Sequence, residues 1–213
     1  MTRIPDITAK GLSVLLYPLF VPTYGIALFT IAYAQQVAHM PAVWWIIAIA
    51  GTFILTCLLP MSAIWWLIRR GGATDIQLED ASQRTIPYLY AVVGFGFWSY
   101  FVISILHAPL YIGSIAIGAT IAIGLVSVIN RRWKISAHLT GFGGLTGGIL
   151  CYYYGNGFMP NVTMICVLAI LSLLLMCARL YLHAHTSAQV CAGWLLGISC
   201  TFFPYCFLNA YVS

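Results

Sequence analysis

Long apolar segments separated by short polar ones constrain this chain more than any other feature of its sequence. Of its 213 residues, 62% are hydrophobic and 6% are charged, whereas a soluble globular domain has roughly 25% charged residues. A helical segment of about 20 apolar residues crosses the hydrocarbon core of a bilayer. The sequence therefore predicts an all-α integral membrane protein, with a single transmembrane domain over residues 1–213.

Seven segments have the length and composition of transmembrane helices, so the expected fold is a bundle of about seven spans. Pro18 and Pro22 predict a kink or a re-entrant turn in the first segment. The fifth is rich in glycine, and small residues let helix backbones approach closely. The segments are Gly11–Tyr33, Ala42–Ile68, Tyr88–Leu106, Leu110–Ile129, His138–Tyr154, Val162–Ala178 and Val190–Leu208.

All nine lysines and arginines fall on one face of this topology. The loops after the second, fourth and sixth segments emerge beside the N-terminus, and the opposite loops contain no lysine or arginine. The positive-inside rule makes the charged face, with the N-terminus, cytoplasmic at the cell (inner) membrane. A second and compatible interpretation is an anion site built from three loops, of which the first, 69–84, is expected to form a short interfacial helix.

Two of these loops carry histidines at predicted helix starts. Ser136 and His138 begin the fifth segment, and His185 precedes the seventh. Unpaired backbone N–H groups and the helix dipole favour a bound anion at such a start. Gln189 has two interpretations. It completes a capping box with Thr186, or, one helical turn from His185, its amide oxygen fixes which nitrogen of that imidazole carries the proton.

Two imidazoles, a guanidinium and two helix starts on one face supply what phosphoryl transfer requires. One imidazole serves as a nucleophile, the other as an acid for the leaving oxygen, and the cations stabilise charge on the remaining oxygens. The guanidinium is that of Arg179, the only arginine in the last third of the chain. The pattern indicates a phosphate-handling site.

These residues resemble the type 2 phosphatidic acid phosphatase (PAP2) superfamily over roughly residues 130–200. Arg179-x5-His185-x3-Gln189, followed by Val-Cys-Ala-Gly-Trp-Leu-Leu-Gly, is similar to the family's third signature. Ile135-Ser136-Ala137-His138 is similar to the second. The resemblance implies a PAP2-like six-helix core with the first span added at the front. It also implies a hydrolase of phosphoric monoesters or diphosphates, with lipid substrates and neither a metal nor another cofactor.

In the scheme that the resemblance implies, His185 is the nucleophile that forms a phosphohistidine. His138 is the general acid that protonates the leaving lipid alkoxide, while Arg179 and the backbone around Ser136 hold the phosphate. Gln189 stands where the family has an aspartate. A neutral amide can orient His185 but does not stabilise its cationic form as a carboxylate does.

The family's first signature is not intact in this chain. By position it should end the span before the second motif, where the sequence offers Arg131, Arg132 and Lys134. These three, with Arg84 from the neighbouring loop, are the expected substitutes for the missing phosphate ligands. For Arg131 and Arg132 an ordinary role as positive-inside anchors stays open.

The sequence thus predicts a membrane-embedded lipid phosphate or diphosphate phosphatase. Its partners are a phosphorylated lipid substrate and the surrounding membrane lipids, with no nucleic acid. Two alternatives stay open. A phosphohistidine reacts with water or with an alcohol, so a lipid phosphotransferase fits the same residues. A catalytically weak or inactive family member that binds anionic lipid headgroups fits the glutamine at position 189.

Overall fold

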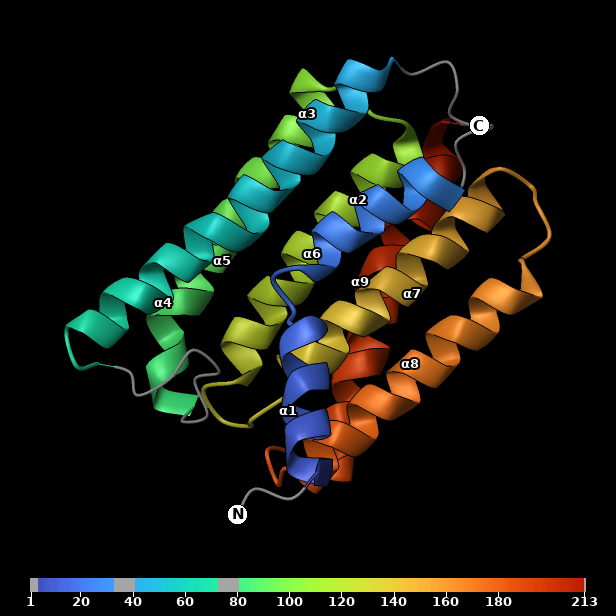
Figure 1. The fold of residues 1–213 in the computed structure, drawn as a ribbon. Helices are drawn as coiled ribbons and strands as arrows, with labels where there is room; N and C mark the ends of the chain where they lie inside the picture. The colour runs from blue at the N-terminus through green and yellow to red at the C-terminus, as the bar shows by residue number, and fades with distance from the viewer. Residues whose placement is uncertain (1–3, 33–40, 73–80, 213) are drawn as a thin grey trace.

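The computed structural model describes residues 4–32, 41–72 and 81–212, and these form a bundle of helices (Figure 1). No strand occurs within these three ranges, so the predicted all-α class is confirmed. Five helical segments are long and apolar enough to cross a membrane, as expected of an integral membrane protein. They are Ala42–Arg69, Thr85–Ile105, Leu110–Ile129, Val162–Tyr181 and Ser187–Asn209.

These five segments correspond to five of the seven predicted spans. α3 (Ala42–Phe53) and α4 (Leu59–Arg69) form one continuous helix through a wider π-helical turn. A similar turn extends α5 (Thr85–Tyr100) to Ile105. The remaining three are α6 (Leu110–Ile129), α8 (Val162–Tyr181) and α9 (Ser187–Val212). The other two predicted spans differ from expectation.

The first predicted span is not one long helix. It consists of α1 (Ile4–Leu15) and α2 (Val21–Ala32), with a helix break between Leu15 and Val21. Pro18 has no N–H to donate, whereas Pro22 lies in the first turn of α2, where a missing donor is tolerated. α2 is apolar but shorter than the five candidate spans. The break is the kink that the prolines predict, and Tyr33 lies outside the described residues.

The fifth predicted span is α7 (Ala137–Gly155), which lies inside the bundle. Its 19 residues are long enough to cross a membrane, but its glycines, threonines and tyrosines make it less apolar than the candidate spans. It packs against α2, α6, α8 and α9, and Leu139, Phe142 and Ile149 are buried. A helix surrounded by other helices does not need the apolar surface that lipid-facing helices require.

α7 and α9 touch backbone to backbone. A Cβ on Gly197 of α9 would collide with the carbonyl oxygen of Thr140, and a Cβ on Gly143 of α7 would collide with that of Trp194. The two helices begin side by side, since the Ser136 N–H donates to the Gln189 carbonyl oxygen at 3.3 Å. The second and third motifs are therefore neighbours in space.

Figure 1 shows the N-terminus and the turns after α4, α6 and α8 at one end of the bundle. Arg69 and Arg179 lie in the last turns of α4 and α8, and Arg131 follows α6, so arginines of the predicted loops gather at this end. The interfacial helix expected over 69–84 falls largely on residues 73–80, which lie outside the described residues. On either side, α4 ends at Arg69 and a short 3-10 turn covers Ala81–Arg84.

Replacing Gly197 by alanine should destabilise the protein, because the new Cβ would press on the backbone oxygen of Thr140, which cannot turn aside. Overpacking of this kind typically costs about 1–3 kcal/mol. Gly124→Ala on α6 is the matched control, because its added Cβ would meet nothing within 4 Å beyond the neighbouring backbone of its own helix. We expect the midpoint of thermal unfolding in detergent to fall for Gly197→Ala alone. Equal midpoints would contradict the close α7–α9 contact.

Candidate functional site

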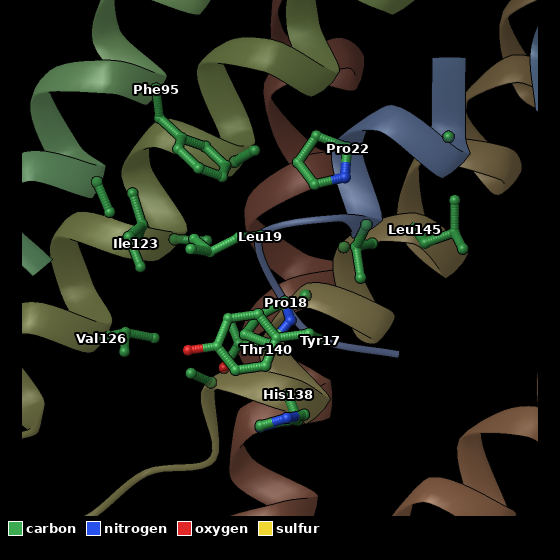
Figure 2. A pocket seen from close by; sticks show the side chains of 18 of the residues that line it. Tyr17, Pro18, Leu19, Pro22, Phe95, Ile123, Val126, His138, Thr140 and Leu145 are labelled. Atoms are coloured by element: carbon green, nitrogen blue, oxygen red, sulfur yellow. The ribbon is translucent and has the colours of Figure 1, made fainter. Parts of the chain in front are cut away.

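A cavity inside the bundle joins four of the predicted site residues. Arg84, His138, Arg179 and His185 all line it, although they come from four separate stretches of the chain. The cavity has a volume of about 130 Å³. Figure 2 shows His138 at one end of this cavity and Phe95 toward the other.

His185 lies in the turn between α8 and α9, with its ring largely buried. Its Nδ1 is 3.0 Å from the carbonyl oxygen of Lys134. A carbonyl only accepts hydrogen bonds, so Nδ1 carries the proton and Nε2 of the neutral ring carries the lone pair. Burial and, second, the charge of Arg179 lower the pKa of His185 to about 4. At neutral pH this side chain is therefore an uncharged imidazole with its lone pair on Nε2.

His138 lies in the first turn of α7 and is held by the N-terminal helix. Its Nε2 is 3.1 Å from the carbonyl oxygen of Ser13, so in the neutral ring Nε2 carries the proton. The Tyr17 ring packs edge-on against the imidazole, with the ring centroids 5.4 Å apart. Sequence reasoning assigned no role to Ser13 or Tyr17, because nothing in the sequence marks a contact across 125 residues.

Two buried guanidinium groups make the same end of the cavity cationic. Arg179, in the last turn of α8, is 1% exposed, and Arg84 is 5% exposed. Arg84 donates to the side-chain oxygen of Asn130 at 3.3 Å and is hydrogen-bonded to the Tyr88 hydroxyl. Neither Asn130 nor Tyr88 was predicted as a site residue. The described residues that line the cavity include no aspartate or glutamate, so its electrostatic field favours an anion.

The start of α7 adds backbone donors to this end. Ser136 is fully buried, and its hydroxyl caps the helix by accepting from the Leu139 N–H at 3.5 Å. Ala137 and His138 line the cavity, and within the described ranges their N–H groups donate to no protein acceptor. Such first-turn N–H groups, with the helix dipole behind them, favour anion binding.

Gln189 completes a capping box at the start of α9. Its amide oxygen accepts from the Thr186 N–H at 3.0 Å, and the Thr186 hydroxyl accepts from the Gln189 N–H at 3.4 Å. Of the two interpretations of this residue, the capping box is present. The His185 nitrogen that Gln189 was expected to fix is held by the Lys134 carbonyl oxygen.

The three basic residues of the 130–136 turn do not join the cavity wall. Arg131 and Arg132 are exposed, and Lys134 is half-buried; none of them is among the lining residues. Lys134 acts on the site through its main chain, by the hydrogen bond to His185. His183 is exposed, and no group of three or more potential metal-ligating side chains occurs among the described residues.

Comparison with known proteins returned no matching family model, no matching curated protein and no matching solved structure. The site is therefore interpreted from its own residues. It offers a neutral imidazole with its lone pair on Nε2, a second imidazole, two guanidinium groups and helix-start N–H groups, at the end of an apolar cavity. This set can bind an anion with several oxygens and attack an electrophilic centre within it.

The Arg179→Gln variant should raise the pKa of His185 toward its ordinary value of about 6.5, because one cation that disfavours imidazolium is removed. In the parent protein, His185 should stay neutral down to about pH 4 and carry its proton on Nδ1. Arg131→Gln is the control, since Arg131 is exposed. Nitrogen chemical shifts of labelled histidine rings, followed through a pH titration, give both quantities. A proton on Nε2 of neutral His185 would contradict the assignment.

Proposed function

We propose that this protein is a membrane-embedded lipid phosphate or diphosphate phosphatase that acts through a phosphohistidine on His185. The proposal rests above all on the meeting of His185, His138 and Arg179 at the cationic end of an apolar cavity. A phosphate head group matches that end, and the apolar part of a lipid matches the remainder. The motif resemblance to the type 2 phosphatidic acid phosphatases supports the same chemistry. In that scheme α3 to α9 form the six-span core, and α1 and α2 are an added first span.

In the first chemical step, the lone pair of His185 Nε2 attacks phosphorus and forms a P–N bond. The bond between phosphorus and the leaving oxygen breaks, and His138, which enters this step as an imidazolium, donates its Nδ1 proton to that oxygen while its Nε2 stays bound to the Ser13 carbonyl oxygen. The guanidinium groups of Arg179 and Arg84, with the N–H groups at the start of α7, stabilise charge on the other phosphate oxygens.

In the second step, water loses a proton to Nδ1 of the now neutral His138 and attacks the phosphohistidine. The P–N bond breaks, its electron pair returns to Nε2, and inorganic phosphate leaves. If an alcohol takes the place of water, the same site is a lipid phosphotransferase. The two activities share every residue named here.

We place the site on the cytoplasmic side of the cell (inner) membrane, because Arg131, Arg132 and Lys134 lie in the turn at this end of the bundle. Arg131→Cys at this end and Met159→Cys at the other are both at exposed positions. In intact cells, an impermeant thiol reagent should label the cysteine at position 159 and spare the one at position 131, above the background of native cysteines. The reverse pattern would contradict this orientation.

The His185→Asn variant should lose phosphate release from a lipid phosphate by about 10³-fold or more, as removal of a catalytic nucleophile does. His183→Asn is the matched control, two residues away and exposed. The φ of His183 is 51°, a left-handed conformation that asparagine tolerates. Both purified variants should unfold at the temperature of the parent. Parental turnover in His185→Asn would refute the proposal.

Two observations favour the alternative of a headgroup-binding protein without turnover. A neutral amide stands at position 189, and the Nε2 of His138 is occupied by the Ser13 carbonyl oxygen. The same assay on Gln189→Asp separates the two functions. A higher rate than the parent indicates a weakened enzyme. If neither the parent nor Gln189→Asp turns the substrate over, but both still bind phosphate, the protein binds headgroups without turnover.

A further inference from the structure

The cavity beyond the cationic end restricts which lipid fits the proposed function. We propose that it takes one hydrocarbon chain attached directly to the phosphate or diphosphate, rather than a diacylglycerol with two ester-linked chains. The inference rests on the proposed function for the position of the head group, at His185 and Arg179. It adds the chemical class of the remainder of the substrate.

The walls of the cavity beyond that end are apolar and come from several helices. α2 contributes Ile26 and Phe29, α5 contributes Phe95, and α6 contributes Ile112 and Ile123. These helices are separate parts of the bundle (Figure 1), so the apolar part of a ligand would lie among helices. Burial of hydrocarbon is favoured in such a space.

The threonine and tryptophan side chains in these walls already donate hydrogen bonds within the protein. The Thr140 hydroxyl donates to the Ser136 carbonyl oxygen at 3.0 Å, and the Thr201 hydroxyl donates to the Gly197 carbonyl oxygen at 3.0 Å. The Trp98 indole N–H donates to the Thr52 hydroxyl at 2.8 Å. The two ester carbonyls of a diacyl lipid would be buried beside side chains that already donate their protons to other groups of the protein. Burying such polar groups without partners is unfavourable, whereas a plain hydrocarbon carries no such group.

Residues in the break between α1 and α2 line the cavity near His138 (Figure 2). Figure 2 shows Leu19 pointing toward Ile123 and the Tyr17 hydroxyl end pointing toward Val126, both beyond His138. All five residues line the cavity. A chain that leaves a head group at His185 would pass between the break and α6. Side chains on both sides of this passage favour one chain over two.

The inference is tested with non-hydrolysable n-alkyl phosphonates of increasing length, bound to the full-length protein in lipid nanodiscs. Affinity should rise by up to about fourfold per methylene, and then level off when the chain fills the cavity. A two-chain phosphonate on a glycerol diester, with the same total number of carbons, should bind at least about tenfold more weakly. Equal affinity of the two classes would overturn the inference.

Two positions on α6 provide a matched pair of phenylalanine variants. Ala119 lines the cavity, whereas Ile121 is exposed on the outside of the bundle and is not a lining residue. Ala119→Phe should shorten the chain length at which affinity stops rising. Ile121→Phe should leave that chain length unchanged. Because partition of the probe into the bilayer is the same for both variants, the difference reports the cavity. If the chain length at which affinity stops rising is the same in Ala119→Phe as in the parent, the inference is overturned.

Leu19→Ala keeps the test decisive if Ala119→Phe does not fold. It removes side-chain atoms from the passage, so binding of the two-chain probe should improve relative to the one-chain probe. An unchanged ratio would count against the inference. Failure of the phosphatase proposal looks different. Alkyl phosphonates would bind with the expected length dependence, while no alkyl phosphate would release phosphate.

Discussion

The side-chain-free contact between α7 and α9 is the constraint on which the rest of the site depends. Gly143 and Gly197 bring the two backbones together, and the Ser136 N–H closes the contact at the charged end. His138 and His185 stand at the starts of these two helices, 47 positions apart in the numbering. A side chain at either glycine would separate the helices, and with them the two imidazoles, because a backbone carbonyl cannot rotate away as a side chain can.

Main-chain carbonyl oxygens, rather than carboxylates, hold both imidazoles. The Lys134 carbonyl oxygen sets the tautomer of His185, and the Ser13 carbonyl oxygen sets that of His138. A carbonyl, like a carboxylate, only accepts hydrogen bonds and so selects which nitrogen carries the proton, but it carries only a partial charge and stabilises an imidazolium less. Because these carbonyl oxygens orient the two imidazoles, the orientation does not depend on Gln189, whose side chain caps α9. It also makes the N-terminal helix part of the site, although that helix lies outside the stretch that resembles the known motifs.

Much of the site was accessible to sequence reasoning, for reasons that differ between residues. His185, His138 and Arg179 are polar side chains beside apolar segments, and their order along the chain carries the resemblance. Arg131 and Arg132 have the same charge, but they follow the end of α6 and remain exposed. Partners that lie far away in the sequence were out of reach, and these are Ser13, Tyr17, Tyr88 and Asn130.

The sequence by itself determined the membrane class, five of the helical spans, the gathering of basic residues at one end and the residue types of the candidate site. Each of these follows from local composition and periodicity, which no distant contact alters. Only the tertiary structure decided which cations line the cavity and which nitrogen of each histidine is available. It alone also revealed that the break between α1 and α2 faces α6 across the apolar cavity. These depend on atoms brought together from distant parts of the chain, where burial and hydrogen bonding differ by position although the residue types are the same.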